Sequence, residues 1–353
     1  MITSKRDTRG GAVAAVLVGA LLLAACGSSS PHTTAHVAKP SKAPTVVNVI
    51  YQPSGLSSYF YANAKDLWAK YGLKINPISI EAGQNELAPL VAGSAEFAFM
   101  GGPPTITAVG KSVPVRIIFS TNDVSRLEGL VVPKGSPITS LRDIVGKTIA
   151  VPTGSSAWAG MHLALAKAGI PFSAVHTENL APSAALAAFE AGSIQGAWIW
   201  DTWLERMVGL GGHIVALEHN YGVQEPNSWV VSSSFVASHP KVVEAFIAAL
   251  NAGAVGVNAD PSAAAASYST LTGVTPAEAV TIMKTEPTFT LADALSPSDP
   301  LSFVSENTGF AEALYRSGEV LAAAGIIPSA PSLVALQGAI DVSIVKATAK
   351  AYG

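Results

Sequence analysis

The sequence predicts an α/β fold with two lobes and a cleft between them. Apolar strands alternate with helices over residues 45–120, and the same alternation begins again near residue 126. In addition, "AGSAEFAFMGGPP" at 92–104 is echoed by "AGSIQGAWIWDTW" at 191–203. Strands that alternate with helices are typical of parallel sheets flanked by helices. Each echo combines a helix end, a strand and a loop, so we expect two equivalent loops at the carboxyl edges of two sheets, where ligands bind in such folds.

The first cycle of the alternation contains four short apolar strands. The helix after the first strand is expected to end at Gly72, because glycine commonly follows the last helical residue. The helix "PPTITAVG" begins with proline, which is tolerated in the first turn. The predicted strands are 45–51, 74–80, 96–100 and 115–120, and the predicted helices lie within 54–73, 84–93 and 103–110.

The second cycle covers about 126–222 and is followed by a largely helical region. Its predicted elements are two strands around a short helix within 127–152, a helix at 155–170, a strand at 173–179, a helix at 183–192, and strands at 195–200 and 213–218. Residues 227–253 then predict a strand and a long helix with Pro240 near its first turn. Asp260–Pro261 and "TPAE" at 275–278, a capping box, mark further helix starts. The tail at 331–353 has helical spacing and is expected to pack on the first lobe.

The first residues of the chain predict export. Basic residues precede an apolar run of about fifteen residues, whereas a bilayer span needs about twenty. The run ends in Leu23-Ala24-Ala25-Cys26, which resembles the lipobox of bacterial lipoproteins, where the cysteine is lipidated and begins the mature chain. The alternative is an ordinary signal peptide with an incidental cysteine. We expect a lipoprotein signal peptide at 1–25 and a flexible tether, rich in Ser, Thr, Pro and Ala, at 26–44.

Composition excludes several classes of protein. Without the predicted signal peptide the chain keeps 18 Lys and Arg residues against 23 Asp and Glu residues, a net charge of −5, which argues against nucleic acid as a partner. Cys26 is the only cysteine, so no intramolecular disulfide can form. A hydrophobic content of 49% with 13% charged residues indicates a large apolar core.

Five segments together resemble the solute-binding proteins of ABC importers. They are "YQPSG", "AGSAEFAFMGGPP", "GLVVPKGSPITSLRDIVGKTIAVPTGSSAW", "AGSIQGAWIWDTW" and "NSWVVSSSFVASHP". The branch is the one for sulfonates, taurine and nitrate, which also includes binders of thiamine precursors, and the resemblance covers roughly 45–330. It implies the type II periplasmic-binding-protein fold, with lobe one at 45–125 plus 223–353 and lobe two at 126–222. It also implies closure over a ligand and delivery to a membrane permease with its ATPase, without chemistry on the ligand.

Three predicted helix starts follow strands at the expected cleft and would suit an anion. The amino terminus of a helix offers unpaired N–H groups and the positive end of the helix dipole. The family uses equivalent loops for sulfonate-type oxyanions, whereas the alternative for each loop is simple helix capping. The candidates are Gln52, Ser54 and Ser57 in the first loop, Gly101, Gly102, Pro103 and Thr105 in the second, and Thr153, Gly154, Ser155 and Ser156 in the third.

Tryptophans beside these loops suggest a ligand with an organic part. Trp158, Trp200 and Trp229 are candidates for the ligand site, while Trp198 shares a strand face with Trp200 and could equally pack in the core. Asp201 could accept a hydrogen bond from an amine or hydroxyl of the ligand, or it could cap the helix that follows. Because buried sulfonates often pair with arginine, Arg116, Arg126 and Arg142 are candidates, of which Arg126 lies nearest the first connection between the lobes.

The sequence carries few signs of enzymatic chemistry. It has no GxSxG, no HExxH and no full GxGxxG, and "TGSSAW" lacks the lysine of a phosphate-binding loop. We therefore expect a non-enzymatic receptor for an organic sulfonate or similar small anionic solute, with no cofactor, metal or catalytic residue, acting as a monomer anchored by lipid at the extracytoplasmic face. Two alternatives stay open: a receptor for a thiamine-precursor pyrimidine or a riboflavin-like ligand, or a pyrimidine-precursor synthase that would use His162.

Overall fold

The chain forms two five-stranded sheets in the computed structural model, which describes residues 43–81, 87–286, 288–305 and 309–353. The predicted signal peptide, Cys26 and all but the last two residues of the predicted tether lie outside the described residues. The first sheet has the order β2 (Leu73–Ser79), β1 (Thr45–Tyr51), β3 (Phe97–Met100), β10 (Ser228–Ser232) and β4 (Val115–Phe119). The second has the order β7 (His176–Glu178), β6 (Thr148–Ala150), β8 (Gly196–Trp200), β5 (Glu128–Val132) and β9 (His213–Leu217).

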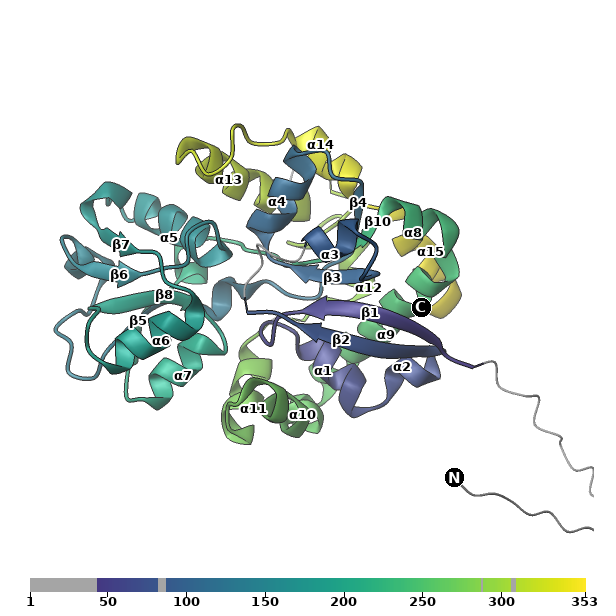
Figure 1. Cartoon of the computed structure of the whole chain (residues 1–353), viewed down its shortest axis with the longest axis horizontal. Coiled ribbons are helices and arrows are strands. Elements are labelled where there is room, and N and C mark those ends of the chain that lie inside the picture. The colour runs from purple at the N-terminus through teal and green to yellow at the C-terminus, as the bar shows by residue number, and fades with distance from the viewer. Residues whose placement is uncertain (1–42, 82–86, 287, 306–308) are drawn as a thin grey trace, which may run out of the picture. The chain divides into compact units, whose positions relative to one another are not determined.

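Helices flank both sheets (Figure 1). The α-helices are α1 (Ser57–Ala64), α2 (Leu67–Lys70), α3 (Leu87–Val91), α4 (Gly102–Gly110), α5 (Ser156–Lys167), α6 (Pro182–Glu190), α7 (Trp203–Gly209), α8 (Ser233–Ser238), α9 (Pro240–Ala259), α10 (Ala265–Thr272), α11 (Pro276–Thr285), α12 (Leu291–Ala294), α13 (Phe310–Ala323), α14 (Leu333–Ala339) and α15 (Val342–Tyr352). Short 3₁₀ turns are η2 (Val124–Arg126), η3 (Leu141–Ile144), η4 (Phe172–Ala174), η5 (Glu218–Tyr221) and η6 (Pro261–Ala264).

Strand direction differs from the sequence prediction at one strand of each sheet. The pairs β1–β2, β1–β3, β6–β7 and β6–β8 are parallel, as expected, but β10 runs antiparallel to β3 and β4, and β5 runs antiparallel to β8 and β9. Both exceptions are strands that the chain enters from the other sheet. The right-handed crossover that fixes direction within one sheet does not constrain such a strand.

The repeated sequence is a repeated structure. In each copy a glycine follows the helix with a positive φ, 70° at Gly93 and 67° at Gly192, which is favourable only for glycine. The hydroxyl of the next residue, Ser94 or Ser193, donates to the carbonyl oxygen five residues earlier at 3.1 Å in both copies. The chain then enters β3 or β8, which pair in parallel with the earlier strands β1 and β6 of their sheets. The two sheets therefore present their loops in equivalent places.

Several predicted helix boundaries are confirmed. Pro240 is the first residue of α9, and Thr275 and Glu278 form the capping box that begins α11. The helix predicted within 54–73 is divided, because Asp66 adopts a left-handed conformation, with φ of 50°, between α1 and α2. Helices α14 and α15 of the tail contact β4 of the first sheet, and α15 also contacts α9.

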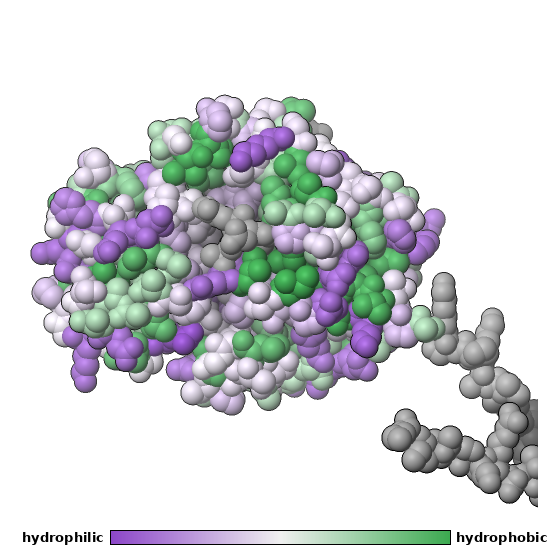
Figure 2. All heavy atoms as spheres, viewed as in Figure 1, coloured by the Kyte–Doolittle hydropathy of each residue, from purple (hydrophilic) through white to green (hydrophobic). Residues whose placement is uncertain are grey.

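Helix α9 belongs to the core. Among the described residues it alone has the length and composition of a membrane span, and 61% of that window is buried. Phe246 on α9 stacks on Phe97 of β3, with ring centroids 3.9 Å apart. A Cβ at Gly253 would lie 2.1 Å from the carbonyl oxygen of Ser58, so glycine permits the close approach of α9 and α1. On the face shown in Figure 2, apolar residues lie in separate groups among polar ones.

Two connecting segments run between the sheets and pair with each other. The backbone N–H of Val124 donates to the carbonyl oxygen of Glu225 at 3.1 Å, and the N–H of Glu225 donates to Oδ1 of Asp123 at 3.0 Å. Asp123 and Pro226 also form an antiparallel bridge. A third segment joins them, since the N–H of Phe289 donates to the carbonyl oxygen of Thr121 at 2.8 Å.

Three glutamates at these connections are completely buried. One oxygen of each accepts a hydrogen bond, from Ser156 Oγ at 2.9 Å for Glu128, from Trp198 Nε1 at 2.8 Å for Glu218 and from Ser317 Oγ at 2.6 Å for Glu225. Within the described residues, no donor lies within hydrogen-bond distance of the second oxygen of any of the three, and none of the three forms an ion pair. Burial raises the pKa of Glu128 to about 8, and burial together with neighbouring carboxyl charge raises the pKa of Glu218 and Glu225.

Replacing Gly253 with alanine should destabilise the protein by about 1–3 kcal/mol, because the new methyl group would push α9 away from the backbone of α1. Urea unfolding gives the difference in free energy. The matched control is Gly338→Ala in α14, where a Cβ meets no atom within 4 Å and where alanine should be neutral or stabilising by up to about 1 kcal/mol. Equal losses in the two variants would contradict the packing argument.

Replacing Glu128 with glutamine should change how stability depends on pH. The buried carboxyl has a raised pKa, so the folded wild type holds a proton that the unfolded chain loses above its ordinary value of 4.5, and stability declines as pH rises towards 8. Relative to wild type, the variant should gain up to about 1.4 kcal/mol for each pH unit between pH 5 and 8. Urea unfolding at three pH values measures this gain. The exposed Glu190→Gln variant is the control, and a Glu128→Gln profile parallel to wild type would refute the prediction.

Candidate functional site

A cavity of about 370 Å³ lies where loops from the two sheets meet. Its lining includes eight of the residues predicted from the sequence, namely Gln52, Ser54, Gly101, Thr153, Gly154, Ser155, Ser156 and Trp200. It also includes Phe99, Pro104, Val124, Pro152, Asn179, Ala181, Pro182 and Asn227, which were not candidates.

Strand direction explains why these residues converge. β1 and β3 of the first sheet, and β6, β7 and β8 of the second, each end just before or within a lining segment. Parallel strands place their carboxyl ends at one edge of a sheet, and ligands of open α/β sheets bind there. Asn227 reaches the same place from the amino end of β10, because that strand runs in the opposite direction.

Helix α5 offers the best anion-binding terminus at the cavity. It has 12 residues, and its first N–H groups, on Ser156 and Ala157, have no acceptor within the helix. Ser155 caps the third N–H, that of Trp158, at 3.2 Å. Two other helices, α4 and α6, also begin at or next to residues of the lining. They offer fewer N–H groups, because α4 carries Pro103 and Pro104 in its first turn, α6 begins with Pro182, and proline has no N–H.

Polar side chains in the lining are uncharged and already oriented. The hydroxyl of Ser54 donates to Asp201, and that of Ser155 donates to the carbonyl oxygen of Pro152 at 2.7 Å. A hydroxyl has one proton, so these two oxygens can present only lone pairs to a ligand. Asn179 accepts the N–H of Thr153 through Oδ1 at 2.9 Å, which leaves its amide N–H groups as donors. The described residues of the lining thus combine hydrogen-bond acceptors and donors, and none of them is Asp, Glu, Lys or Arg.

The remaining sequence candidates lie outside this lining, and each has a structural partner. Ser57 donates to Glu286, and Thr105 donates to the carbonyl oxygen of Gly101 at 2.9 Å. Gly102 and Pro103 are buried in the first turn of α4. Trp158 packs on His162 and Phe172. Trp229 lies in an aromatic cluster with Tyr59, Phe99 and Phe246. Trp198 is fully buried and, as described, donates to Glu218.

Asp201 is fully buried behind the cavity wall. It does not cap the following helix, because the N-cap of α7 is Thr202 and no side chain caps that terminus. Its carboxyl oxygens accept hydrogen bonds from Ser54, Gly55 and Tyr268. Burial raises the pKa of Asp201, and these hydrogen bonds oppose the rise.

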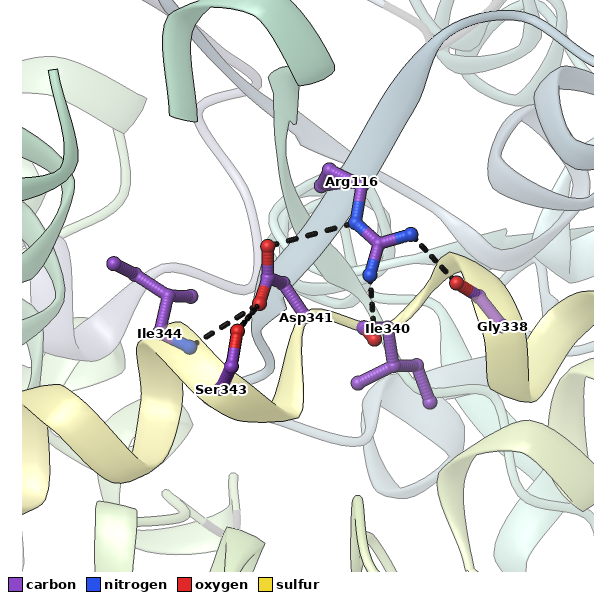
Figure 3. A network of polar contacts seen from close by, with 6 residues as sticks. All are labelled: Arg116, Gly338, Ile340, Asp341, Ser343 and Ile344. Carbon is purple, nitrogen blue, oxygen red and sulfur yellow. Dashed lines mark hydrogen bonds and ion pairs between the residues drawn. The ribbon is translucent and has the colours of Figure 1, made fainter. Parts of the chain in front are cut away.

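None of the described residues that line the cavity is an arginine. Arg116 points to the tail of the chain, where it donates to the carbonyl oxygens of Gly338 and Ile340 and pairs with Asp341 at 3.5 Å (Figure 3). Arg126, in η2, and Arg142, in η3, are both exposed. The three arginines proposed from the sequence as sulfonate partners are therefore not among the described residues of the lining, whereas backbone N–H groups and the amide of Asn179 are.

His162 is also remote from the cavity lining. Its ring stacks on Phe172 with centroids 3.3 Å apart and lies 4.1 Å from the ring of Trp158. Burial lowers the pKa of His162 to about 4, which keeps the imidazole neutral at physiological pH. The packing interpretation of this histidine fits the structure better than a reactive role at the cavity.

Comparisons with known proteins agree with the fold. The chain is 30% identical over 203 residues to the taurine-binding periplasmic protein of Escherichia coli K12, a match that covers 57% of this chain and 62% of that protein, so it spans less than two thirds of the relative. The alkanesulfonate-binding protein of Xanthomonas axonopodis pv. citri, solved with MOPS, superposes with a TM-score of 0.69 at 21% identity over 85% of this chain and 99% of that one. The periplasmic aliphatic sulphonate binding protein of E. coli gives a TM-score of 0.68 at 18% identity, covering 83% and 91% of the two chains.

The two structural neighbours establish the periplasmic-binding-protein fold that the sequence predicted. The family model described as NMT1/THI5 like matches residues 55–264, which include both sheets except β1 and all but one of the lining segments. By this match over more than half of its length, the chain belongs to the NMT1/THI5-like family.

Proposed function

We propose that the protein is the solute-binding receptor of an ABC importer and captures a small organic sulfonate or a related anionic solute. The observation that carries the proposal is the cavity between the strand ends of two sheets, with the amino terminus of α5 at its wall and no charged side chain among the described residues of its lining. The relatives named above bind taurine or aliphatic sulfonates, which supports this class of solute.

The lining suits a solute that has one anionic group and an organic part. Unpaired N–H groups of α5 can hold one oxyanion without a neutralising cation. Phe99, Val124 and Trp200 offer apolar surface for the rest of the molecule. The lone pairs of Ser54 and Ser155 need a donor, so a solute that also carries an amine or hydroxyl matches the lining more fully.

We propose that binding closes two lobes, 45–125 plus 223–353 and 126–222, about the connections near 121–128 and 220–228. A solute that contacts residues of both lobes only when they are closed shifts the population towards that arrangement. The permease, with its ATPase, would recognise and bind the closed form. Lipidation at Cys26, which lies outside the described residues, would hold a monomeric receptor at the extracytoplasmic face of the membrane.

A second solute class is favoured by one observation. Phe99 and Trp200 both line the cavity, and flat aromatic walls also suit a thiamine-precursor pyrimidine or a riboflavin-like ligand. The synthase alternative has less support, because His162 packs between two aromatic rings away from the lining.

Calorimetric titration with a panel of solutes tests the proposal. Organic sulfonates should bind, with amine-bearing members such as taurine strongest among those of similar size. Sulfate and nitrate should bind weakly or not at all, because an inorganic ion leaves the apolar wall uncovered. Binding of a pyrimidine or of riboflavin with no sulfonate response would replace the first solute class by the second, and tight binding of sulfate alone would refute both.

Replacing Trp200 with alanine should weaken binding of the best solute by about tenfold or more, equivalent to about 1.4 kcal/mol, because the apolar wall is lost. The same titration measures the effect. Trp203→Ala is the matched control, since Trp203 lies three residues further on in α7 and outside the lining, and it should leave the affinity unchanged. Unaltered affinity in Trp200→Ala would show that the solute does not use this wall.

A further inference from the structure

The carboxyl group of Asp201 joins the ends of the two sheets. Asp201 follows β8 in the second sheet, whereas two of its three donors, Ser54 and Gly55, follow β1 in the first. Ser54 Oγ lies 2.9 Å from Oδ1, and the N–H of Gly55 donates to Oδ2 at 3.2 Å. The third donor is the hydroxyl of Tyr268 in α10, 2.7 Å from Oδ2. Every donor therefore lies outside the 126–222 segment that contains Asp201.

Because the carboxyl group of Asp201 is buried, each of its oxygens depends on these hydrogen-bond donors. Asp201 and Tyr268 are both 0% exposed, so an oxygen that lost its donor would find no water in its place. Within the described residues no cation pairs with Asp201, and the nearby ionisable groups, Glu205 and Glu286, are acidic. Hydrogen bonds from neutral donors therefore stabilise this carboxyl group, and the bonds from Ser54 and Gly55 require that the ends of β1 and β8 adjoin.

The same contact shapes the cavity. Ser54 lines the cavity, as does Trp200, the residue before Asp201. Oγ of Ser54 also contacts the backbone carbonyl oxygen of Asp201, and Thr202 Oγ1 donates to the carbonyl oxygen of Pro53 at 3.3 Å. These bonds involve only groups of the protein, so they can form whether or not a solute is bound.

We propose that Asp201 is a positioning residue, a latch that holds the two sheets together at the cavity and keeps the Ser54 lone pairs directed at the solute. The proposal rests on the proposed function in one respect: it assumes that closure accompanies binding. It assigns Asp201 to the closing equilibrium and not to direct contact with the solute. When a binding-competent arrangement is only partly populated, the apparent affinity falls in proportion to that population. The latch therefore raises affinity by favouring the closed arrangement before the solute arrives.

Tyr268→Phe is the principal test, because it removes one donor to Asp201 and keeps the packing of the ring. Without solute, its radius of gyration in small-angle scattering should exceed that of wild type, and hydrogen exchange at the Gly55 amide should be faster. Its affinity for the best solute should fall about 3- to 10-fold, while saturating solute should restore the wild-type radius. Asp201→Asn should shift all three measurements in the same direction.

The matched control is Tyr315→Phe, since the hydroxyl of Tyr315 donates to Glu319 at 2.9 Å on the exposed surface. It should leave the radius, the exchange rate and the affinity as in wild type. A purely structural role for Tyr268 would lower the melting temperature but leave the radius and the Gly55 exchange of the solute-free protein unchanged, and that result would overturn the proposal. Should Asp201→Asn fail to fold, Tyr268→Phe decides alone.

The solute-free measurements separate this proposal from the proposed function. If no member of the solute panel binds, the proposed function fails, yet the radius and the Gly55 exchange still show whether the latch holds the sheets together. If sulfonates bind and neither measurement differs between Tyr268→Phe and wild type, the latch fails and the receptor function stands.

Discussion

Strand direction is the constraint on which the site depends. Five parallel strands end at the edge where the two sheets adjoin: β1 and β3 in one sheet, and β6, β7 and β8 in the other. The loops that follow these strands therefore all lie at that edge. The antiparallel strands β10 and β5 do not disturb this arrangement. Each is the first strand that the chain forms after a connecting segment from the other sheet, and β10 adds Asn227 to the cavity from its amino end. Because parallel strands end at the same edge in both sheets, segments more than a hundred residues apart in the sequence together form the polar lining.

The buried glutamates at the connections carry the same sign of charge as the proposed solute. Glu128, Glu218 and Glu225 are buried without cations, and their raised pKa values mean that part of this charge is neutralised by protons. A fully ionised cluster beside the cavity would repel a sulfonate. Protonated carboxyls remove that repulsion and remain able to hold Ser156 in place at the start of α5. We infer that dipoles and N–H groups accommodate the anion, beside buried carboxyls whose raised pKa values reduce their negative charge.

Local signals in the sequence predicted most of the fold and about half of the cavity lining. Gly93 and Gly192 mark helix ends because glycine, which has no Cβ, tolerates the positive φ that a helix end requires. The Thr275–Glu278 capping box likewise depends only on residues close together in the sequence. The direction of β10 and the entry of Asn179 and Asn227 into the cavity depend on which strands adjoin, which no short segment encodes. Arg126 illustrates the same limit, since proximity along the chain to a connection did not bring its side chain to the lining.

Ser54 links recognition to closure. Its hydroxyl donates to Asp201, so an anionic group of a solute cannot accept a hydrogen bond from Ser54 without breaking the bond between Ser54 and Asp201. A solute that instead offers a donor to the Ser54 oxygen leaves the contact intact and can strengthen it, because hydrogen bonds in a chain polarise one another. Selectivity for solutes with a donor group and closure of the protein are therefore two consequences of one hydroxyl orientation. A substitution at Asp201 or Tyr268 should for that reason weaken binding of amine-bearing sulfonates more than that of simple alkanesulfonates.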